Sequence, residues 1–341
     1  MVIKHPKYFT LLLFLATLFS QAQPQEALQI AFYNVENLFH PSDDSLTRDE
    51  EFTPQGERYW SFYRYKEKSN RTAKVLLSLG AGEPPACVGL AEIENRQVLE
   101  DLAQSPVLSK AAYKIVHFES PDRRGIDVAA LYRPELLTLD TAVAIPVKWA
   151  GSPEFATRDI LYLKMIPKAW SDTLHIFFNH WPSRYGGQAQ SEPKRMAAAA
   201  LLKRFCDSLQ AKVGANLIIA GDFNDEWDNK SLLEVLQAAP KKEATELINL
   251  AATEALNMGS HRYRGVWSYL DQVIVSAHIF QGQGSTAVVD NRMFTHRPPF
   301  LLEKDERFPG KVPFRTFKGY RYHGGFSDHL PVYIWVTNSP P

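Results

Sequence analysis

The sequence predicts an α/β protein whose sheets contain antiparallel strand pairs. Runs rich in β-branched and aromatic residues outnumber the stretches with helical spacing, and many neighbouring strands have no helix between them. A simple doubly wound parallel sheet, in which a helix follows each strand, does not fit this pattern. Because the chain shows neither an internal repeat nor a long low-complexity linker, we expect one domain over residues 23–341.

The expected strands are short, apolar and bounded by turn residues. They cover residues 28–39, 86–93, 113–120, 127–134, 159–166, 173–181, 216–225, 269–276 and 330–336. Helices are expected over residues 67–79 and 95–104. A third helix is expected to begin at Ser191, which can cap it, because a first turn tolerates Pro193 and apolar residues between Ala198 and Leu209 then share one face.

The first 22 residues have the pattern of a secretory signal peptide. Lys4, His5 and Lys7 precede a short apolar run, and Ser20–Ala22 offers small residues for cleavage. The run is short for a membrane span, which needs about 20 residues, although an N-terminal anchor helix is the alternative. We therefore expect a secreted or periplasmic chain that is monomeric and is not stably inserted in a membrane.

Composition indicates a globular protein without a strong charge bias. Hydrophobic residues make up 45% of the 341 residues, and 38 Lys and Arg balance 38 Asp and Glu. A strongly basic nucleic-acid-binding protein is excluded, but a local basic patch is not. The only cysteines are Cys87 and Cys206, which we expect to be buried free thiols, although a pairing between them stays open.

Two stretches look like insertions between the predicted elements. Residues 40–60 are polar and irregular, whereas residues 291–323 are rich in Pro, Gly, Arg and aromatic residues. The second stretch has an excess of basic residues in a chain of zero net charge, and it ends shortly before Ser327. Most charged runs are solvated loops, but this position favours a segment that flanks a functional site.

Polar residues of the types used in catalysis stand at the ends of successive strands. They are Asn34, Glu36, Glu92, Glu94, Asn179, His180, Asp222, Asn224, Asp225, Asp271, Asp328 and His329. Each of them alone could be a turn residue, a helix cap or a core histidine. Together they indicate a site, because an apolar core does not collect several carboxylates and two imidazoles without an ion or a substrate to pair with them.

The residue types indicate a hard metal ion and a phosphate ester. Carboxylate and amide oxygens without any cysteine suit Mg²⁺, Mn²⁺ or Ca²⁺ better than Zn²⁺. Such an ion can neutralise phosphate oxygens, while a carboxylate aligns a water molecule and a histidine stabilises the developing charge. The sequence has no Gly-x-x-x-x-Gly-Lys loop and no Gly-x-Ser-x-Gly motif, so a triphosphate switch and serine-esterase chemistry are unsupported.

These residues lie, in order, in motifs that resemble those of the endonuclease/exonuclease/phosphatase superfamily, whose fold is deoxyribonuclease I-like. The motifs are YNVEN, GLAEIEN, RRGIDVAALYR, NHWPSR, GDFND, YLDQVIVS and SDHLP, of which GDFND and SDHLP are the most specific pair. The resemblance covers nearly all of the chain after residue 22. It implies a four-layer α/β sandwich, in which two packed mixed sheets are flanked by helices, and an enzyme that usually uses Mg²⁺.

The resemblance assigns roles to the residues that match its motifs. Asn34 and Glu92 correspond to the first metal-binding pair, and Asp328 corresponds to the carboxylate that completes or supports this site. Asp222 corresponds to the residue that orients or activates the water. Asn224 corresponds to a residue that holds water or phosphate.

Two imidazoles are expected to assist at the phosphate. His329 matches the histidine that contacts the scissile phosphate, and Asp271 matches the carboxylate that orients its ring. His180 matches a second imidazole found in the deoxyribonuclease and sphingomyelinase branches. Arg184 and Arg195 follow His180 closely in sequence and are candidates for binding phosphate oxygens.

Two acidic residues fit the family pattern less well. Glu36 stands where some relatives carry Asp and others a different residue, which leaves its role at the metal open. Asp127 lies near the position where some members keep an acid paired with the second imidazole. A pairing of Asp127 with His180 is therefore a hypothesis.

The resemblance implies the chemistry more closely than the substrate, because its members include nucleases, sphingomyelinases, inositol phosphatases and deadenylases. A secreted nuclease acting on DNA or RNA is the first expectation, since the basic and aromatic residues of 291–323 could follow a phosphate backbone and stack on bases. The alternative is a phosphodiesterase or phosphatase of small phosphoesters or lipid headgroups, such as inositol phosphate or sphingomyelin. A non-catalytic binding module would be expected to lack metal or histidine positions, and all of them are present.

Overall fold

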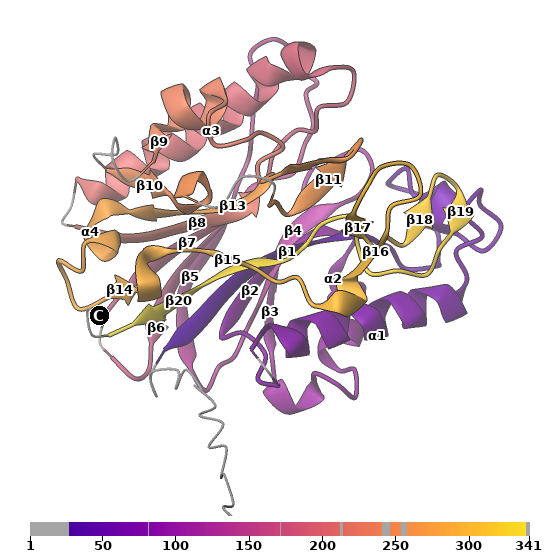
Figure 1. The fold of residues 1–341 in the computed structure, drawn as a ribbon, viewed down its shortest axis with the longest axis horizontal. Coiled ribbons are helices and arrows are strands. Elements are labelled where there is room, and N and C mark those ends of the chain that lie inside the picture. The colour runs from indigo at the N-terminus through magenta and orange to yellow at the C-terminus, as the bar shows by residue number, and fades with distance from the viewer. Residues whose placement is uncertain are drawn as a thin grey trace, which may run out of the picture.

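Two seven-stranded mixed sheets pack face to face, and helices cover their outer faces in the computed structural model of the protein (Figure 1). The structure describes residues 27–338 apart from 81, 171, 212–213, 241–245 and 254–257. This architecture confirms the predicted four-layer α/β sandwich. The signal peptide predicted at residues 1–22 lies outside the described residues.

The first sheet is built mainly from the N-terminal part of the chain and is completed by strands from its C-terminal part. In spatial order it contains β14 (Ala287–Val288), β20 (Val332–Thr337), β1 (Leu28–Leu38), β2 (Cys87–Ile93), β4 (Asp127–Tyr132) and β3 (Lys114–His117), and β15 (Phe294–Thr295) also pairs with β20. The central pair β1 and β2 is parallel, whereas β20 and β4 flank it in antiparallel fashion.

The second sheet repeats this arrangement. In spatial order it contains β5 (Leu137–Ile145), β6 (Ile160–Pro167), β7 (Leu174–His180), β8 (Asn216–Asp222), β13 (Asp271–Ser276), β10 (Leu247–Asn249) and β9 (Ala238–Ala239). Its central pair β7 and β8 is parallel, and β6 and β13 run antiparallel beside it. The edge strand β5 was not predicted, and neither were the short strands β9 and β10 at the other edge. Only the first and last residues of β5 are buried, so its sequence lacks the pattern of a core strand.

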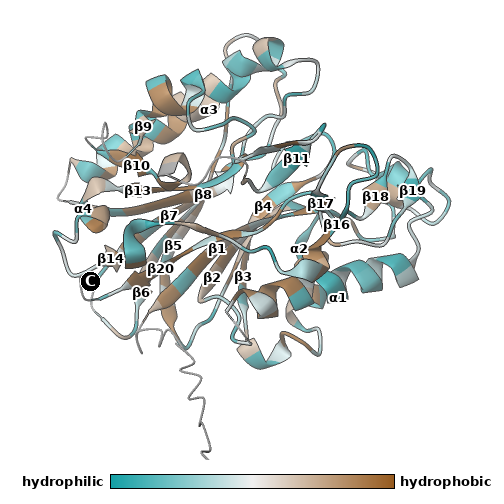
Figure 2. Ribbon diagram, viewed as in Figure 1, coloured by the Kyte–Doolittle hydropathy of each residue, from teal (hydrophilic) through white to brown (hydrophobic). Residues whose placement is uncertain are grey.

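Three apolar clusters hold the four layers together. One lies between the sheets and contains Phe32 and Phe178, whose stacked rings have centroids 6.4 Å apart. The second packs the first sheet against α1 (Phe62–Leu79) and α2 (Arg96–Ala103), and the third packs the second sheet against α3 (Gln188–Gln210). Figure 2 shows the resulting pattern of apolar strands inside and polar helix faces outside.

The helices begin where polar side chains or glycines end the preceding loops. The Ser61 hydroxyl accepts a hydrogen bond from the Arg64 amide at the start of α1, and Asn95 caps α2 in the same way. The third helix begins at Gln188 and not at Ser191 as predicted, because Gly186 and Gly187 turn the chain with positive φ angles of 82° and 114°.

Short elements complete the fold. They are α4 (Ala277–Phe280), a π-helical turn η3 (Ser231–Leu236), the 3₁₀ turns η1 (Glu50–Phe52), η2 (Ser109–Ala111), η4 (Leu250–Thr253), η5 (Val289–Asn291) and η6 (Pro299–Leu301), and the hairpins β11–β12 (His261–Tyr263, Val266–Ser268), β16–β17 (Leu302–Lys304, Lys311–Pro313) and β18–β19 (Phe317–Lys318, Arg321–Tyr322). Among the described residues, no helix has the length and apolar character needed to cross a membrane.

Cys87 and Cys206 are both buried and free, as expected.

The two predicted insertions pack against each other. The Phe317 ring contacts Phe52 and Trp60, with ring centroids 6.3 and 5.7 Å apart, and the Arg58 guanidinium lies over the same ring. Arg58 also donates a hydrogen bond to the Gly319 carbonyl. The segment 291–323 is therefore folded against one end of the first sheet, and only parts of it, such as residues 306–311, are exposed as in a solvated loop (Figure 1).

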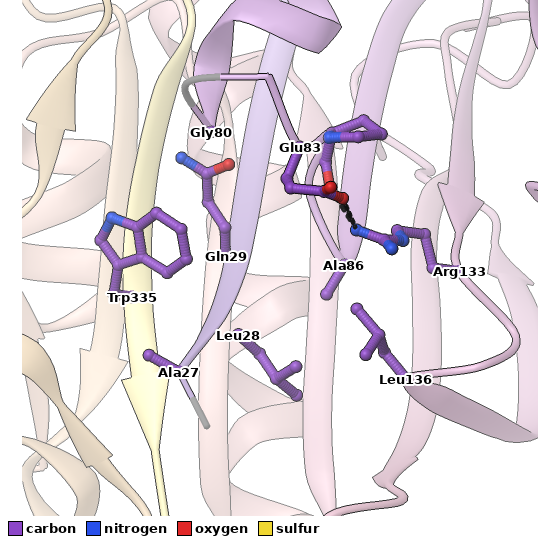
Figure 3. Close-up of a pocket in the computed structure, with 10 residues that line it drawn as sticks. Ala27, Leu28, Gln29, Gly80, Glu83, Ala86, Arg133, Leu136 and Trp335 are labelled. Carbon is purple, nitrogen blue, oxygen red and sulfur yellow. Dashed lines mark hydrogen bonds and ion pairs between the residues drawn. The ribbon is translucent and has the colours of Figure 1, made fainter. Parts of the chain in front are cut away.

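A surface pocket lies at the opposite end of β1 from the polar strand ends (Figure 3). It is lined by Leu28, Gln29 and Trp335 and by an ion pair between Arg133 and Glu83 at 3.1 Å. The Gln29 side-chain amide donates a hydrogen bond to the Leu79 carbonyl at the end of α1. The residues predicted to be functional do not line this pocket, so the site must be sought at the other end of the sheets.

We expect Gly89→Ala to destabilise the protein, because a Cβ at this position would lie 2.2 Å from the Phe178 ring. Overpacking of this kind typically costs about 1–3 kcal/mol. Urea unfolding should show a lower midpoint, and adding Phe178→Leu should recover part of the loss. Thr138→Ala on the exposed edge strand is the control and should change the free energy of unfolding little. Equal stability of the Gly89 variant and the wild type would contradict this close contact between the sheets.

Candidate active site

The predicted site residues meet where the strand ends of the two sheets face each other. His180 and Asp222 end the parallel strands β7 and β8 and are direct neighbours in register, and Asp271 at the start of β13 is the neighbour of Asp222 on its other side. The first sheet contributes Asn34, whose amide donates a 3.0 Å hydrogen bond to Asp222 Oδ2 across the cleft. The cleft therefore needs both sheets.

Irregular backbone turns the side chains of the strand ends into the cleft. The pairing of β1 with β2 shifts register after Asn34, and Glu36, Asn37 and Glu92 adopt positive φ angles of 57°, 54° and 63°. The Asn37 amide then donates to Glu92 Oε2 at 2.9 Å and fixes this carboxylate. Positive φ is uncommon for residues other than glycine and clusters at functional sites, which supports a functional role for this edge.

The hydrogen bond expected between Asp271 and His329 is present. His329 Nδ1 lies 2.6 Å from Asp271 Oδ2, and both residues are buried. The Ser327 hydroxyl accepts from the His329 amide and donates to the Asn34 carbonyl, which fixes the loop that carries the ring. Burial opposes a charge on His329, but the carboxylates of Asp271 and Asp222 outweigh it and hold the pKa of the imidazole well above its usual range.

The second imidazole has the opposite electrostatic state. His180 Nε2 lies 3.6 Å from Asp222 Oδ2 and 4.0 Å from Glu92 Oε1, so it faces the same cleft. Burial, followed by the positive charges of Arg158 and Arg124, lowers the pKa of His180 well below its usual value. A neutral His180 and a positively charged His329 thus stand on two sides of Asp222.

The hypothesis that Asp127 pairs with His180 is wrong. Asp127 Oδ2 lies 2.9 Å from His117 Nε2, and its other oxygen accepts hydrogen bonds from the Ser120 amide and hydroxyl. Asp127 begins β4, and its side chain is used to join this strand to the end of the neighbouring strand β3. Nδ1 of His180 is buried and has no hydrogen-bond partner among the described residues.

Asp222 is the most central carboxylate of the site. Its Oδ1 accepts from the Asn224 amide at 3.0 Å, while the Asn224 side chain donates to the Trp181 carbonyl at 3.0 Å. Burial raises the pKa of Asp222 to about 7, against the opposing charge of His329 and with a further contribution from Asp271. A carboxylate with this pKa can accept a proton near neutral pH.

The carboxylates differ in how far they open to the cleft. Side-chain exposure is 15% for Glu92 and 24% for Asp328, but only 2% for Asp222 and 1% for Asp271. The two accessible carboxylates are those predicted to bind the metal, and with Asn34 they form the set of hard oxygen donors that Mg²⁺ or Mn²⁺ prefers. The residues present therefore fit a divalent ion.

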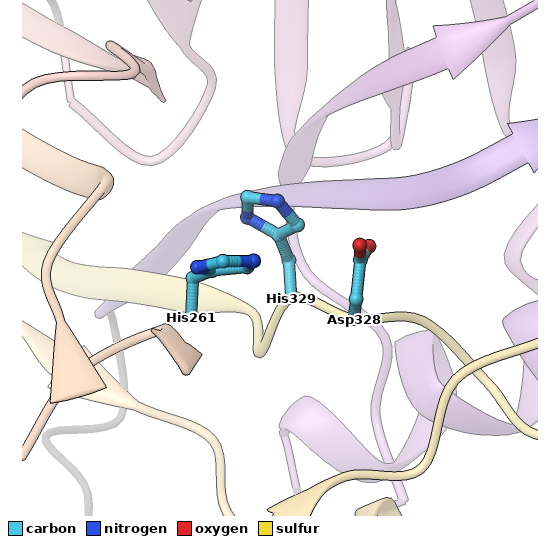
Figure 4. A group of neighbouring side chains, drawn as sticks. All are labelled: His261, Asp328 and His329. Carbon is cyan, nitrogen blue, oxygen red and sulfur yellow. The ribbon is translucent and has the colours of Figure 1, made fainter. Parts of the chain in front are cut away.

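A third histidine joins the cleft and was not predicted. His261 in β11 forms a bridge with His329, and their ring centroids are 4.8 Å apart. Donor atoms of His261, Asp328 and His329 all lie within 4.8 Å of one another. Figure 4 shows these three side chains side by side. Burial, with the charge of His329, lowers the pKa of His261 to about 4. No motif in the sequence marks His261, because residues 261–268 form only a short hairpin.

Arg195 does not bind phosphate, contrary to the prediction. Its side chain is 0% exposed, its Nε lies 2.7 Å from Asp225 Oδ2, and its other donors bind backbone carbonyls and Ser191. Arg184 is 30% exposed, but it donates to the Asn224 carbonyl and to Asn229. Both arginines hold the loop after β8 in place, so they position the site residues and do not face the substrate.

Arg315 is a further cation at the cleft, and it was not predicted as a site residue. It belongs to the segment 291–323, and its guanidinium contacts Glu36 and Asp328. The basic excess of this segment and its position before Ser327 were the available signals. The aromatic residues of the segment, by contrast, mostly pack against one another and against the sheet, which removes most of the support they gave to base stacking. Tyr320 and Phe308 are the exposed ones, at 60% and 38%.

The fold and the residues of this cleft are those of a phosphoesterase. The model of the Endonuclease/Exonuclease/phosphatase family matches residues 29–338, so the chain belongs to this family. The chain is accordingly an enzyme that hydrolyses phosphate esters, in a family that generally depends on a divalent metal ion. A comparison with curated protein sequences gives no match.

Solved structures share the fold at low sequence identity. A family member from Bacteroides thetaiotaomicron superposes with a TM-score of 0.58 at 15% identity, covering 92% of this chain and 98% of its own. A mannosyl-6-phosphatase from the same species gives a TM-score of 0.55 at 16% identity, with 91% and 99% covered. D. rerio TDP2 complexed with single-strand DNA product gives 0.53 at 14% identity, with 91% and 99% covered.

We expect Asp222→Asn to stabilise the metal-free protein near neutral pH. An acid with a pKa raised from 3.8 to about 7 keeps its proton in the folded state, so stability falls as the pH rises through this window. The variant removes this loss, and its melting temperature in EDTA should exceed that of the wild type by several degrees at about pH 8, with little difference at about pH 4.

Asp225→Asn is the matched control and should have the opposite effect. Asp225 is equally buried, but it neutralises the fully buried Arg195 at 2.7 Å. Breaking such a pair costs on the order of 3 kcal/mol. If both variants shifted the melting temperature in the same direction, the assignment of Asp222 as a destabilising and Asp225 as a stabilising carboxylate would be wrong.

Proposed function

We propose that this enzyme is a Mg²⁺-dependent phosphodiester hydrolase that uses water as its nucleophile, and that its first substrate class is nucleic acid. The observation that carries the proposal is the convergence of Asp222, His180 and the Asp271–His329 pair on one cleft. Mn²⁺ or Ca²⁺ are alternative ions of the same chemistry.

Each residue has a distinct task in this proposal. Asp222 aligns the attacking water and takes its proton, for which a pKa of about 7 is suited. The charged His329, oriented by Asp271, donates a hydrogen bond to a phosphate oxygen as negative charge develops. The neutral His180 can donate to another phosphate oxygen, and Asn224 borders the water position through its hydrogen bond to Asp222.

Asn34, Glu92 and Asp328 would hold the divalent ion. When bound, the ion supplies positive charge that neutralises phosphate oxygens. The accessibility of the Glu92 and Asp328 side chains supports this assignment, because the ion has to reach these carboxylates from the cleft and still face the phosphate of the substrate. Asp222 and Asp271 are too enclosed for this role and act through hydrogen bonds.

A second substrate class has its own support. The aromatic residues of 291–323 are mostly engaged in packing, so they offer few platforms for bases, and a structural neighbour is a mannosyl-6-phosphatase. A small phosphoester, such as a sugar or inositol phosphate or a lipid headgroup, is therefore the alternative. Nucleic acid stays first because of the basic excess of 291–323 and the likeness to D. rerio TDP2, which was solved with single-strand DNA product.

We also propose that residues 1–22 direct export and are removed, so that residues 23–341 act as one secreted or periplasmic monomer. The basic start, apolar run and small residues at 20–22 support this proposal. N-terminal sequencing of protein recovered outside the cytoplasm should begin at Gln23. An uncleaved start would favour an anchor helix instead.

A substrate panel decides between the two classes. Purified protein with Mg²⁺ should cleave single- or double-stranded DNA or RNA, and EDTA should stop the reaction. Turnover of sugar phosphates, inositol phosphates, sphingomyelin or bis-p-nitrophenyl phosphate without cleavage of any nucleic acid would establish the alternative. Activity that persists in EDTA would contradict the metal dependence.

His329→Gln should lower kcat by about 10²–10⁴-fold, because it removes the charged donor at the phosphate. Asp271→Asn should lower kcat less and shift the pH profile, because it removes the carboxylate that keeps this imidazole charged. Thermal melts should show that both variants are folded. His175→Gln is the control, because His175 lies near the start of β7, at the opposite end of the strand from His180, where it pairs with Tyr162, and it should leave turnover unchanged. Full activity of the His329 variant would disprove its assignment.

A further inference from the structure

Arg315 bridges two carboxylates at the edge of the cleft. Its Nη2 lies 2.9 Å from Glu36 Oε1 and 2.9 Å from Asp328 Oδ2, and its Nε donates a further hydrogen bond to Glu36 Oε1 at 3.1 Å. A planar guanidinium with several donors matches paired carboxylates well. A positive charge from the segment 291–323 therefore occupies the space between Glu36 and Asp328.

Glu36 is closed to other ligands. Its side chain is only 4% exposed, and its second oxygen accepts from the Thr316 amide at 2.7 Å. Thr316 is held in turn by the buried Lys68, whose Nζ contacts the Thr316 hydroxyl and the Phe326 carbonyl. Helix α1, strand β1 and the segment 291–323 thus converge on this carboxylate, and its charge is balanced inside the fold.

Glu92 is in a different situation. It is 15% exposed, and its contacts are the Asn37 amide at 2.9 Å and His180 Nε2 at 4.0 Å. Within the described part of the chain, Glu92 forms no ion pair with Lys or Arg, so its negative charge is available to a cation from solution.

We propose that Arg315 is a built-in cation that takes the place of a second metal ion between Glu36 and Asp328, so that the cleft binds one divalent ion and not two. The single ion would be held by Asn34, Glu92 and the part of Asp328 that faces away from Arg315. The guanidinium donors already occupy Glu36 Oε1 and Asp328 Oδ2, which are the oxygens that a divalent ion between these two carboxylates would need. This inference rests on the metal dependence proposed above.

The number of Mn²⁺ ions bound per chain tests this inference directly. The paramagnetic resonance signal of free Mn²⁺ should show one bound ion in the wild type. Arg315→Met removes the charge and frees Glu36 Oε1 and Asp328 Oδ2 from the guanidinium, so it should raise the number to two. Arg315→Lys keeps a charge and should leave the number at one. Arg307→Met, at an exposed arginine of the same segment, is the control and should also leave it at one.

The outcomes separate this inference from the proposed function. Two ions in the wild type, or one ion in the Arg315→Met variant, would overturn the inference while leaving the metal dependence intact. No bound Mn²⁺ in the wild type would overturn both.

If thermal melts show that Arg315→Met does not fold, Glu36→Gln decides, because it keeps the shape and the hydrogen bond from Thr316. Mn²⁺ affinity unchanged in Glu36→Gln supports the inference, whereas a loss of about tenfold or more would make Glu36 a metal ligand and overturn it.

Discussion

The hydrogen bond between Asp271 and His329 joins the two sheets where their strand ends meet, and the site depends on it. Asp271 and Asp222 are neighbours in the second sheet, and both are buried. Buried carboxylates are costly unless they are paired. The first sheet supplies the partners, a charged His329 for Asp271 and the Asn34 amide for Asp222, so the cleft exists only where the two sheets pack against each other.

The same edge concentrates features that a stable fold would avoid. Three strand-end residues, Glu36, Asn37 and Glu92, have positive φ, and Asp222 is held with a raised pKa by burial. Unfavourable backbone angles and buried charges that occur together in this way mark functional sites. The strain persists there because the surrounding packing holds these residues in place. The apolar clusters on both sides of each sheet provide that packing.

Segment 291–323 shows how one fold can be adapted to a particular chemistry. The strands place the same residue types at the cleft as the family motifs imply, but Arg315 reaches the cleft from a layer packed on Trp60 and Phe52. The structural neighbours include both a mannosyl-6-phosphatase and a DNA-bound TDP2 at 16% and 14% identity. Fold alone therefore does not choose the substrate, and the loops around the cleft have to do so.

The sequence by itself determined the central strands of the sandwich and the polar residues at their ends, because side-chain alternation and apolar runs are local signals. It did not reveal the outer strands β5, β9, β10, β14 and β15. The family resemblance added the Asp271–His329 pair. Only the tertiary structure decided that Asp127 binds His117, that Arg195 is buried against Asp225, and that Arg315 reaches Asp328. These contacts join residues that are far apart in the chain, so they depend on how the loops pack and no local pattern encodes them. A charged side chain that follows a strand looks the same in the sequence whether it faces the cleft or a buried partner.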